Sequence, residues 1–409
     1  MTRRVKIGAA LLLLGIITVA GISAGRDFWA DWHFRSLEDA VRQGDYPRAK
    51  RHLQSCMTVW SNSWRCDLWK IRLARLTGRL DDAERLLLAA GLRQQSISRE
   101  SLGLETLLLK AQQGLCNEDE EMRLRGFVDQ DHPDTPLLLH ALVLGYLRLY
   151  RLHDAEGCLK LWLEIQPDNV DALLQQGKVH ERLTRFREAA DTYREILRRK
   201  PNDDEVMIRV AYLQVLTNQI TEATDHVERL LQTRRDDPRV LLAAGVYRQH
   251  QSKLDEAVQL LDELLKQEPH DVRGLLARGK IELQREQARA ALPYLERALA
   301  TAPKDYQALF LMAQCLQQLG KGAEGKKLQE QALLAQQDLT RLGDLTKILQ
   351  QRPNDPDIRC EIGTLLISFG NEREGRIWLE SALHFAPNHA GAQRALDKLG
   401  AAPARGAPR

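Results

Sequence analysis

Apolar residues recur along most of this chain at the spacing of a helix, and the whole pattern repeats every 34 residues. In one such unit, the apolar positions between Leu173 and Leu183 mark one face of a first helix. Those between Phe186 and Leu197 mark a second helix, which Pro201 ends. Each unit therefore predicts two helices of about 13 residues joined by a short turn. The alanine that starts each second helix returns in register: Ala155, Ala189, Ala223, Ala257 and Ala291.

Prolines and small residues keep the same spacing. A proline follows the second helix at Pro133, Pro167, Pro201, Pro269 and Pro303. Arg235 takes the one missing place. A small residue stands in the first helix, where two paired helices cross closely: Gly177, Ala211, Gly245, Gly279 and Ala313. A repeat of this length is typical of an all-α solenoid, in which stacked helical hairpins present a surface to a partner.

This pattern resembles the tetratricopeptide repeat (TPR) family, whose motif sets large apolar residues, glycine, alanines and proline at fixed places. In the unit from Val272 to Asp305, the matching residues are Leu275, Gly279, Ala291, Leu295, Ala298 and Pro303. The resemblance covers about ten units between Ala30 and His389. It implies a right-handed α-solenoid whose first helices line a concave surface.

The chain divides where this pattern changes. The expected segments are a membrane anchor (1–26), irregular N-terminal repeats (27–135), the regular array (136–337), an inserted helix (338–352), the last repeat with a capping helix (353–400), and a disordered tail (401–409).

The inserted helix is inferred from a break in the spacing. The markers Gly325 and Gly375 lie 50 residues apart, which is 16 more than the regular 34. The extra residues carry an amphipathic pattern at Leu339, Leu342, Leu345, Ile348 and Leu349. A helix out of phase with its neighbours would bend the array or expose an apolar strip. Self-association through 338–352 is therefore one expected role.

An uncharged stretch of 19 residues, Ile7–Gly25, follows the basic residues Arg3, Arg4 and Lys6. As a transmembrane helix it would span roughly 28 Å, close to the thickness of the hydrocarbon core of a bilayer. The positive-inside rule then places the N-terminus in the cytoplasm and the repeats outside, as expected for a single-pass protein of a bacterial cytoplasmic membrane. Cleavage after the small residues at the end of the stretch would instead release a secreted protein.

Three aromatic residues follow this stretch, namely Phe28, Trp29 and Trp32. They fit the aromatic belt that forms at a membrane interface. Packing inside the first helical hairpin is the alternative interpretation.

The composition argues against a nucleic-acid partner and against a metal or redox site. The 59 basic and 56 acidic residues are interspersed and leave a net charge of +3, so no basic surface for nucleic acid is expected. Six cysteines are scattered without a C-x-x-C pair that would indicate a metal or redox site. An oxidising compartment would permit a disulfide between Cys56 and Cys66, which the sequence leaves open.

Two segments resemble a phosphate-binding loop or a metal site, and each has a simpler structural explanation. Gly320–Lys327 partly matches a phosphate-binding loop, but it follows a helix and is expected to form the turn inside a repeat. The acidic group Glu118–Glu121 lacks the ordered spacing of a calcium loop and is expected to be solvated. We therefore expect no catalytic, metal or cofactor site, and no enzymatic activity.

The family resemblance places partner-binding residues on the first helices. Equivalent positions form two stripes one turn apart. The first is His140, Leu174, Ile208, Leu242, Leu276 and Phe310, and the second is Leu144, Lys178, Tyr212, Val246, Lys280 and Gln314. The Lys/Asn/Arg set with which some family members grip acidic C-terminal tails is absent. Because the stripes are largely apolar, we expect them to hold an extended or helical protein segment. Packing between neighbouring first helices is the alternative.

The expected function is that of a membrane-anchored, extracytoplasmic scaffold or adaptor that mediates protein–protein interaction through this groove. A sharper alternative is an assembly factor of the cell envelope, similar to the TPR proteins of cytochrome c maturation or of polysaccharide export. The residues do not name the partner or the pathway.

Overall fold

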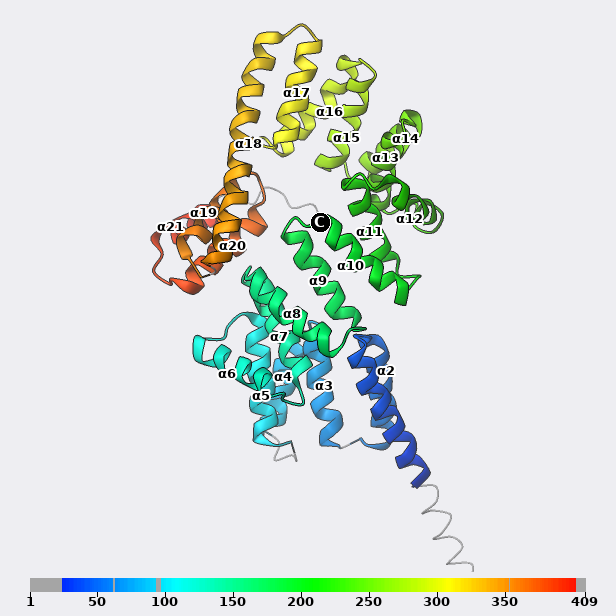
Figure 1. Ribbon diagram of the computed structural model, residues 1–409, viewed down its shortest axis with the longest axis vertical. Helices are drawn as coiled ribbons and strands as arrows, with labels where there is room; N and C mark the ends of the chain where they lie inside the picture. Colours follow the sequence, from blue (N-terminus) through cyan, green and yellow to red (C-terminus); the bar gives the residue numbers. More distant parts are fainter. Residues whose placement is uncertain (1–23, 62, 93–96, 353, 402–409) are drawn as a thin grey trace, which may run out of the picture. The chain divides into compact units, whose positions relative to one another are not determined.

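The computed structural model describes residues 24–61, 63–92, 97–352 and 354–401, which fold as helices joined by short turns (Figure 1). The all-α prediction is confirmed for these residues. The chain divides into two compact units. The first comprises the described residues up to Leu147 together with Asp154–Gln176. The second comprises Arg148–His153 and the described residues from Gly177 onward.

The helices follow one another in hairpins (Figure 1). Up to the middle of the chain they are a helix over residues 24–42, α2 (Tyr46–Val59), α3 (Trp64–Leu76), α4 (Leu80–Leu92), α5 (Arg99–Gln113), α6 (Glu118–Asp129), α7 (Thr135–Arg148), α8 (Leu152–Ile165), α9 (Val170–Arg182) and α10 (Phe186–Arg199). The later helices are α11 (Asp204–Leu216), α12 (Ile220–Thr233), α13 (Pro238–His250), α14 (Leu254–Gln267), α15 (Val272–Gln284), α16 (Ala288–Thr301), α17 (Tyr306–Gln318), α18 (Gly322–Gln351), α19 (Pro356–Ser368), α20 (Glu372–Phe385) and α21 (Ala390–Ala401).

The same backbone features recur at the start and at the turn of most regular hairpins. The first helix is capped by a side chain that accepts a hydrogen bond from the backbone N–H three residues later, at Asn169, Asp203, Asp271, Asp305 and Asp355. The turn between the two helices contains a residue with positive φ: Tyr150, Thr184, Asn218, Ser252, Glu286, Gly320 and Gly370. The segment that begins at Gly320 is therefore a hairpin turn that enters α18, as the sequence predicts.

Small residues let the paired helices meet. A Cβ atom added at Gly279 would lie 2.8 Å from the side chain of Leu295, and one at Gly177 would lie 2.3 Å from the ring of Tyr193. The five marker alanines of the second helices are fully buried. The predicted role of the small residues in hairpin crossing is confirmed at these positions.

In the second unit, successive first helices pack side by side: α11 on α13, α13 on α15, and α15 on α17. One core cluster joins α15, α16 and α17 through buried residues such as Leu275, Leu295 and Met312. Each hairpin thus buries its apolar face against its neighbours, as in a solenoid.

In the first unit, hairpins that are not consecutive in the sequence also contact each other. The start of α9 docks on the turn of the first hairpin, where Val170 N–H donates to the carbonyl of Gln43 over 3.0 Å. Asn169 Nδ2 donates to the carbonyl of Arg42, also over 3.0 Å. Gly44 is required at this contact because its φ is +70° and a Cβ there would lie 2.6 Å from the backbone nitrogen of Asp171. Periodicity could not predict this contact, since it joins repeats that are not consecutive.

The insert near 338–352 does not form a helix of its own, which corrects the sequence-based prediction. It continues α18, which runs unbroken for 30 residues from Gly322 to Gln351. No proline interrupts this stretch, so nothing forces the helix to end where the regular period would end it. The added turns bury Leu345 and Leu349 in a cluster with Ile358 and Ile362 of α19.

The N-terminal prediction concerns residues that are largely outside the described part of the chain. Of the stretch 7–25, only residues 24 and 25 are described, and the tail 402–409 also lies outside. Among the described residues, no helix combines the length and apolar character needed to cross a membrane. Cys56 and Cys66 are described as free thiols.

Candidate partner-binding surfaces

The two predicted stripes lie on first helices of both units. His140, Leu144 and Leu174 belong to the first unit, and the residues from Lys178 to Phe310 belong to the second. Within the second unit, the first helices that carry these residues, from α11 to α17, pack side by side (Figure 1).

Most of the first stripe is buried. The side chains of Ile208, Leu242 and Leu276 are only 3%, 3% and 7% exposed, so they pack within the array and cannot contact a partner. The alternative interpretation, packing between helices, describes these three residues, and the groove prediction is wrong for them. Phe310 is the exception, because 47% of it is exposed.

The second stripe remains accessible in the second unit. Tyr212 and Val246 are half-buried, and Lys280 is exposed. Together with Phe310 they form what we call the accessible stripe, which crosses α11, α13, α15 and α17. The ring of Tyr306 stacks on Phe310, with centroids 6.1 Å apart, and extends the aromatic surface at that end.

The charge of the accessible stripe is positive. In the described part of the chain, Lys280 takes part in no salt bridge. Burial, and then the charge of Lys280, lower the pKa of His250, which shows that the two side chains are near each other. The guanidinium of Arg273 lies 5.7 Å from the ring centre of Tyr212 and also pairs with Asp271. The accessible stripe therefore combines the apolar or aromatic side chains of Tyr212, Val246 and Phe310 with the positive charge of Lys280.

His140 does not line a surface. It is 1% exposed, and its Nε2 lies 3.3 Å from Asp171 Oδ2, to which the hydroxyl of Tyr46 donates over 2.8 Å. Burial lowers the pKa of His140 and outweighs the opposing effect of Asp171. Burial disfavours ionisation of Asp171, but hydrogen bonds from His140 and Tyr46 hold its pKa below the usual value. A neutral imidazole thus sits beside an ionised carboxylate where α2, α7 and α9 meet.

A buried ionic network lies in the same unit. Glu105 on α5 is fully buried and accepts from Arg72 Nε over 2.7 Å and from Arg75 Nε over 3.3 Å. Arg72 also donates to Asp134 over 2.6 Å. The network ties α3 and α5 to the start of α7. Periodicity did not indicate it, because arginines on an apolar helix face carry no sequence signal of their own.

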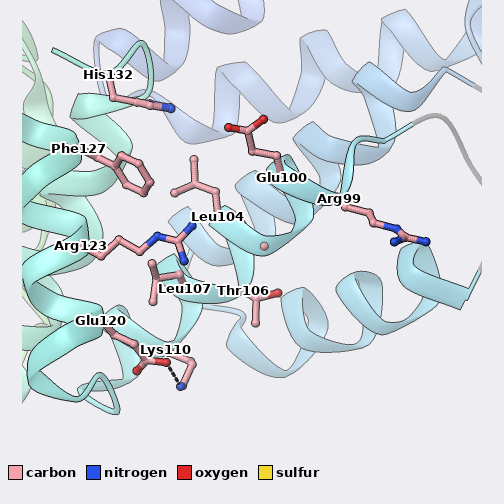
Figure 2. A pocket seen from close by; sticks show the side chains of 11 residues that line it. Arg99, Glu100, Leu104, Thr106, Leu107, Lys110, Glu120, Arg123, Phe127 and His132 are labelled. Carbon is pink, nitrogen blue, oxygen red and sulfur yellow. Dashed lines mark hydrogen bonds and ion pairs between the residues drawn. The ribbon is translucent and has the colours of Figure 1, made fainter. Parts of the chain in front are cut away.

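The third hairpin holds a pocket that the sequence analysis missed. Figure 2 shows the side chains of Leu104, Leu107 and Phe127 facing one another between α5 and α6, in a pocket of about 370 Å³. The guanidinium of Arg123 lies 5.6 Å from the ring centre of Phe127. Lys110 and Glu120 form an ion pair at the rim (Figure 2). The only available signal was the irregular length of this unit.

The described residues contain no group of three or more His, Cys, Asp or Glu residues arranged to hold a metal ion. Burial raises the pKa of Cys56 to about 12 and that of Cys116 to about 11. Both thiols are therefore weak nucleophiles at neutral pH.

Two family models match this chain, and both describe a tetratricopeptide repeat. One matches residues 182–245 and 282–345, and the other matches 36–97 and 140–207. Together they cover more than half of the chain. No curated protein matches the chain.

Several solved structures match parts of this chain. A tetratricopeptide repeat protein from Parabacteroides merdae is 16% identical over 64% of this chain and 98% of its own, with a TM-score of 0.41. YrrB, described as a TPR protein with an unusual peptide-binding site, is 20% identical over 51% of this chain and 99% of its own, with a TM-score of 0.29. MamA of MSR-1 is 20% identical over 41% and 97%, with a TM-score of 0.33. At these identities and scores the similarity does not extend to a partner or a binding site.

Proposed function

The chain belongs to the tetratricopeptide repeat family, and on that premise we propose that it is a scaffold that binds a segment of another protein along its accessible stripe. Proteins of this family generally mediate protein–protein interaction and are typically not enzymes. The observation that carries the proposal is the accessibility of Tyr212, Val246, Lys280 and Phe310 on adjacent first helices.

The chemistry of the stripe indicates the kind of segment that it binds. Tyr212 and Phe310 offer aromatic surface, which contributes strongly when it is desolvated in an interface. Lys280 offers a positive charge that takes part in no ion pair among the described residues. The proposed ligand is therefore a segment with apolar side chains on either side of an acidic residue.

Site-directed crosslinking tests this proposal. A photoreactive amino acid at Val246 in the full-length protein should capture a partner that mass spectrometry identifies. Tyr212→Glu together with Phe310→Glu should then weaken binding of that partner by about tenfold or more. The matched control carries Gln232→Glu and Gln259→Glu, which place the same charges on exposed positions of second helices. Equal binding by both folded variants would show that the partner does not use the stripe.

We further propose that residues 7–25 anchor the scaffold in a membrane and that the repeats lie on the extracytoplasmic side. The length of this uncharged stretch and the basic residues before it support this arrangement. The protein should then stay with membranes during alkaline carbonate extraction. Its repeats should be digested by a protease added from the extracytoplasmic side. Recovery of a soluble chain that lacks residues 1–25 would show cleavage in place of anchoring.

A further inference from the structure

The helix over residues 24–42 directs a group of aromatic side chains away from the repeat core. Phe28, Trp29 and Trp32 are 77%, 44% and 53% exposed, whereas Ala30 and Leu37 on the opposite side of the same helix are fully buried. These three exposed residues are called the aromatic face below. The sequence allows two explanations of these residues, an aromatic belt at a membrane interface and packing inside the first hairpin. Because the three side chains are exposed, the second explanation does not describe them.

Neighbouring rings hold the two indoles in place. The rings of Trp29 and Trp32 meet His33 edge-on, with centroids 4.2 and 4.8 Å away. Nδ1 of His33 lies 2.8 Å from Nδ1 of His52 on α2, and Trp32 also meets His52 at 5.8 Å. Because the hairpin supports the indoles from behind, they present a preorganised surface instead of freely moving side chains.

Basic side chains border the aromatic face. Arg26 is exposed on the same helix, and Arg51 is exposed on α2. Burial lowers the pKa of His52, with smaller contributions from the charges of His33, Arg48 and Arg51. The exposed carboxylate of Asp27 also lies beside Phe28 in the sequence. The aromatic rings and the arginines match the region of a bilayer where indoles meet lipid carbonyls and cations meet phosphates.

The uncharged stretch that precedes the aromatic face determines the position of this face relative to the bilayer. The uncharged stretch Ile7–Gly25 ends three residues before Phe28. Trp32 lies seven residues beyond that end, which is about 10 Å along a helix. A segment that crosses the hydrocarbon core with residues 7–25 would therefore leave the aromatic face at the height of the lipid headgroups.

We propose that the aromatic face is a lipid-binding surface, with Trp29 and Trp32 embedded in the interface of the bilayer. This inference rests on the proposed membrane anchor and adds to it a second point of attachment. A transmembrane helix alone leaves the repeats free to tilt and rotate. Two fixed indoles hold the first hairpin against the membrane surface and restrict the directions in which the repeats can point.

Tryptophan quenching tests the proposal on the full-length protein. The protein is reconstituted in bilayers of phosphatidylcholine and phosphatidylglycerol that contain lipids brominated at a shallow or a deep position of the acyl chain. Shallow bromines should quench the fluorescence more strongly than deep ones. The double variant Trp29→Phe, Trp32→Phe should lose most of this quenching. The matched control is Trp64→Phe, which removes a 40% exposed indole of α3 and should keep the quenching.

The outcomes separate this inference from the proposed anchor. Quenching that the double variant retains, in protein that resists carbonate extraction, would overturn the lipid-binding surface and leave the anchor standing. A wild-type protein that resists extraction but is not quenched at all would do the same, and would point to a protein partner on the aromatic face. Release of the protein by carbonate would overturn both.

Discussion

Arg359 donates a hydrogen bond from its guanidinium to the backbone carbonyl of Leu149, 2.7 Å away and 210 residues earlier in the chain. Arg359 is fully buried, and it also donates to the hydroxyl of Ser381, which in turn donates to the same carbonyl over 2.8 Å. Tyr150 packs against Trp378, with ring centroids 4.5 Å apart. The last repeat thus holds the turn 149–151, between α7 and α8, by polar contacts that are shielded from water.

Replacing Arg359 should release this turn. Arg359→Met keeps an apolar stem but leaves the carbonyl of Leu149 with one donor fewer, at an expected cost of about 3 kcal/mol. Hydrogen exchange should become faster in α19 and α20, and urea unfolding of the second unit should shift to lower concentration. Arg376→Met, an exposed substitution on α20, should cost about 0.5 kcal/mol or less. Equal protection in the two variants would contradict the inferred role of Arg359.

The first unit should lose stability in mild acid, chiefly because of the buried His140 and to a smaller extent because of His52, whose pKa is also lowered. The folded pKa of His140 lies below its unfolded value, so the unfolded chain takes up a proton first as the pH falls. The stability from a neutral His140 is complete above about pH 6.5 and declines below it, by at most about 1.4 kcal/mol per pH unit. Asp171, whose pKa is also lowered, adds a loss in the same direction at more acidic pH.

Urea unfolding at neutral pH and near pH 5 measures this dependence. Trp162 is a suitable probe because its ring centre lies 5.5 Å from that of His140. His140→Gln should flatten the loss between the two pH values. His270→Gln, at an exposed position outside the first unit, should leave it unchanged. A wild-type protein that is equally stable at both pH values would refute the assignment.

Periodicity predicted the parts of the fold that repeat. It located the hairpins because each one needs the same buried alanine and the same close crossing, as at Ala291 and Gly279. It predicted little of what joins distant repeats. Asn169 with the first hairpin and Arg359 with Leu149 are single polar contacts over long sequence separations, and no periodic signal marks them.

The sequence predicted which helix face carries the candidate site, but not how deeply each side chain on that face is buried. Leu242 and Val246 lie one turn apart on α13, yet the first is 3% exposed and the second is half-buried. The difference depends on how closely α11 and α15 approach α13, which a sequence pattern does not specify. The stripe therefore contributes fewer apolar side chains to a partner than its sequence indicates.

Substitution should have opposite effects at a glycine where two helices cross closely and at a glycine with open space around it. A Cβ at Gly279 would meet Leu295 at 2.8 Å, so Gly279→Val should open the hairpin and destabilise the second unit by about 2 kcal/mol or more. Gly343 lies inside α18 with no atom within 4 Å of an added Cβ. Gly343→Ala should instead stabilise by about 0.5–1 kcal/mol, because alanine loses less backbone entropy in a helix. Thermal unfolding that shifts in the same direction for both would contradict this distinction.

The insert in α18 should first of all stabilise the fold, because its apolar residues pack against α19. Deleting the 16 residues Gln337–Arg352 restores the 34-residue spacing but removes Leu345 and Leu349, which are 1% and 7% exposed in the cluster with α19. Loss of two such side chains should cost at least about 4 kcal/mol, seen as earlier unfolding of α19 and α20 in urea.

Self-association through 338–352 remains a separate prediction, and two exposed residues of this range allow a test that spares the core. Leu339 and Ile348 are 43% and 37% exposed. Leu339→Glu with Ile348→Glu should leave unfolding nearly unchanged but lower the molar mass found by light scattering of the detergent-solubilised protein, because charge on an apolar contact opposes association. Leu333→Glu with Leu334→Glu, at exposed positions of α18 before the insert, is the matched control and should keep the wild-type mass. A wild-type protein that is already monomeric would show that the insert serves the packing of α19 alone.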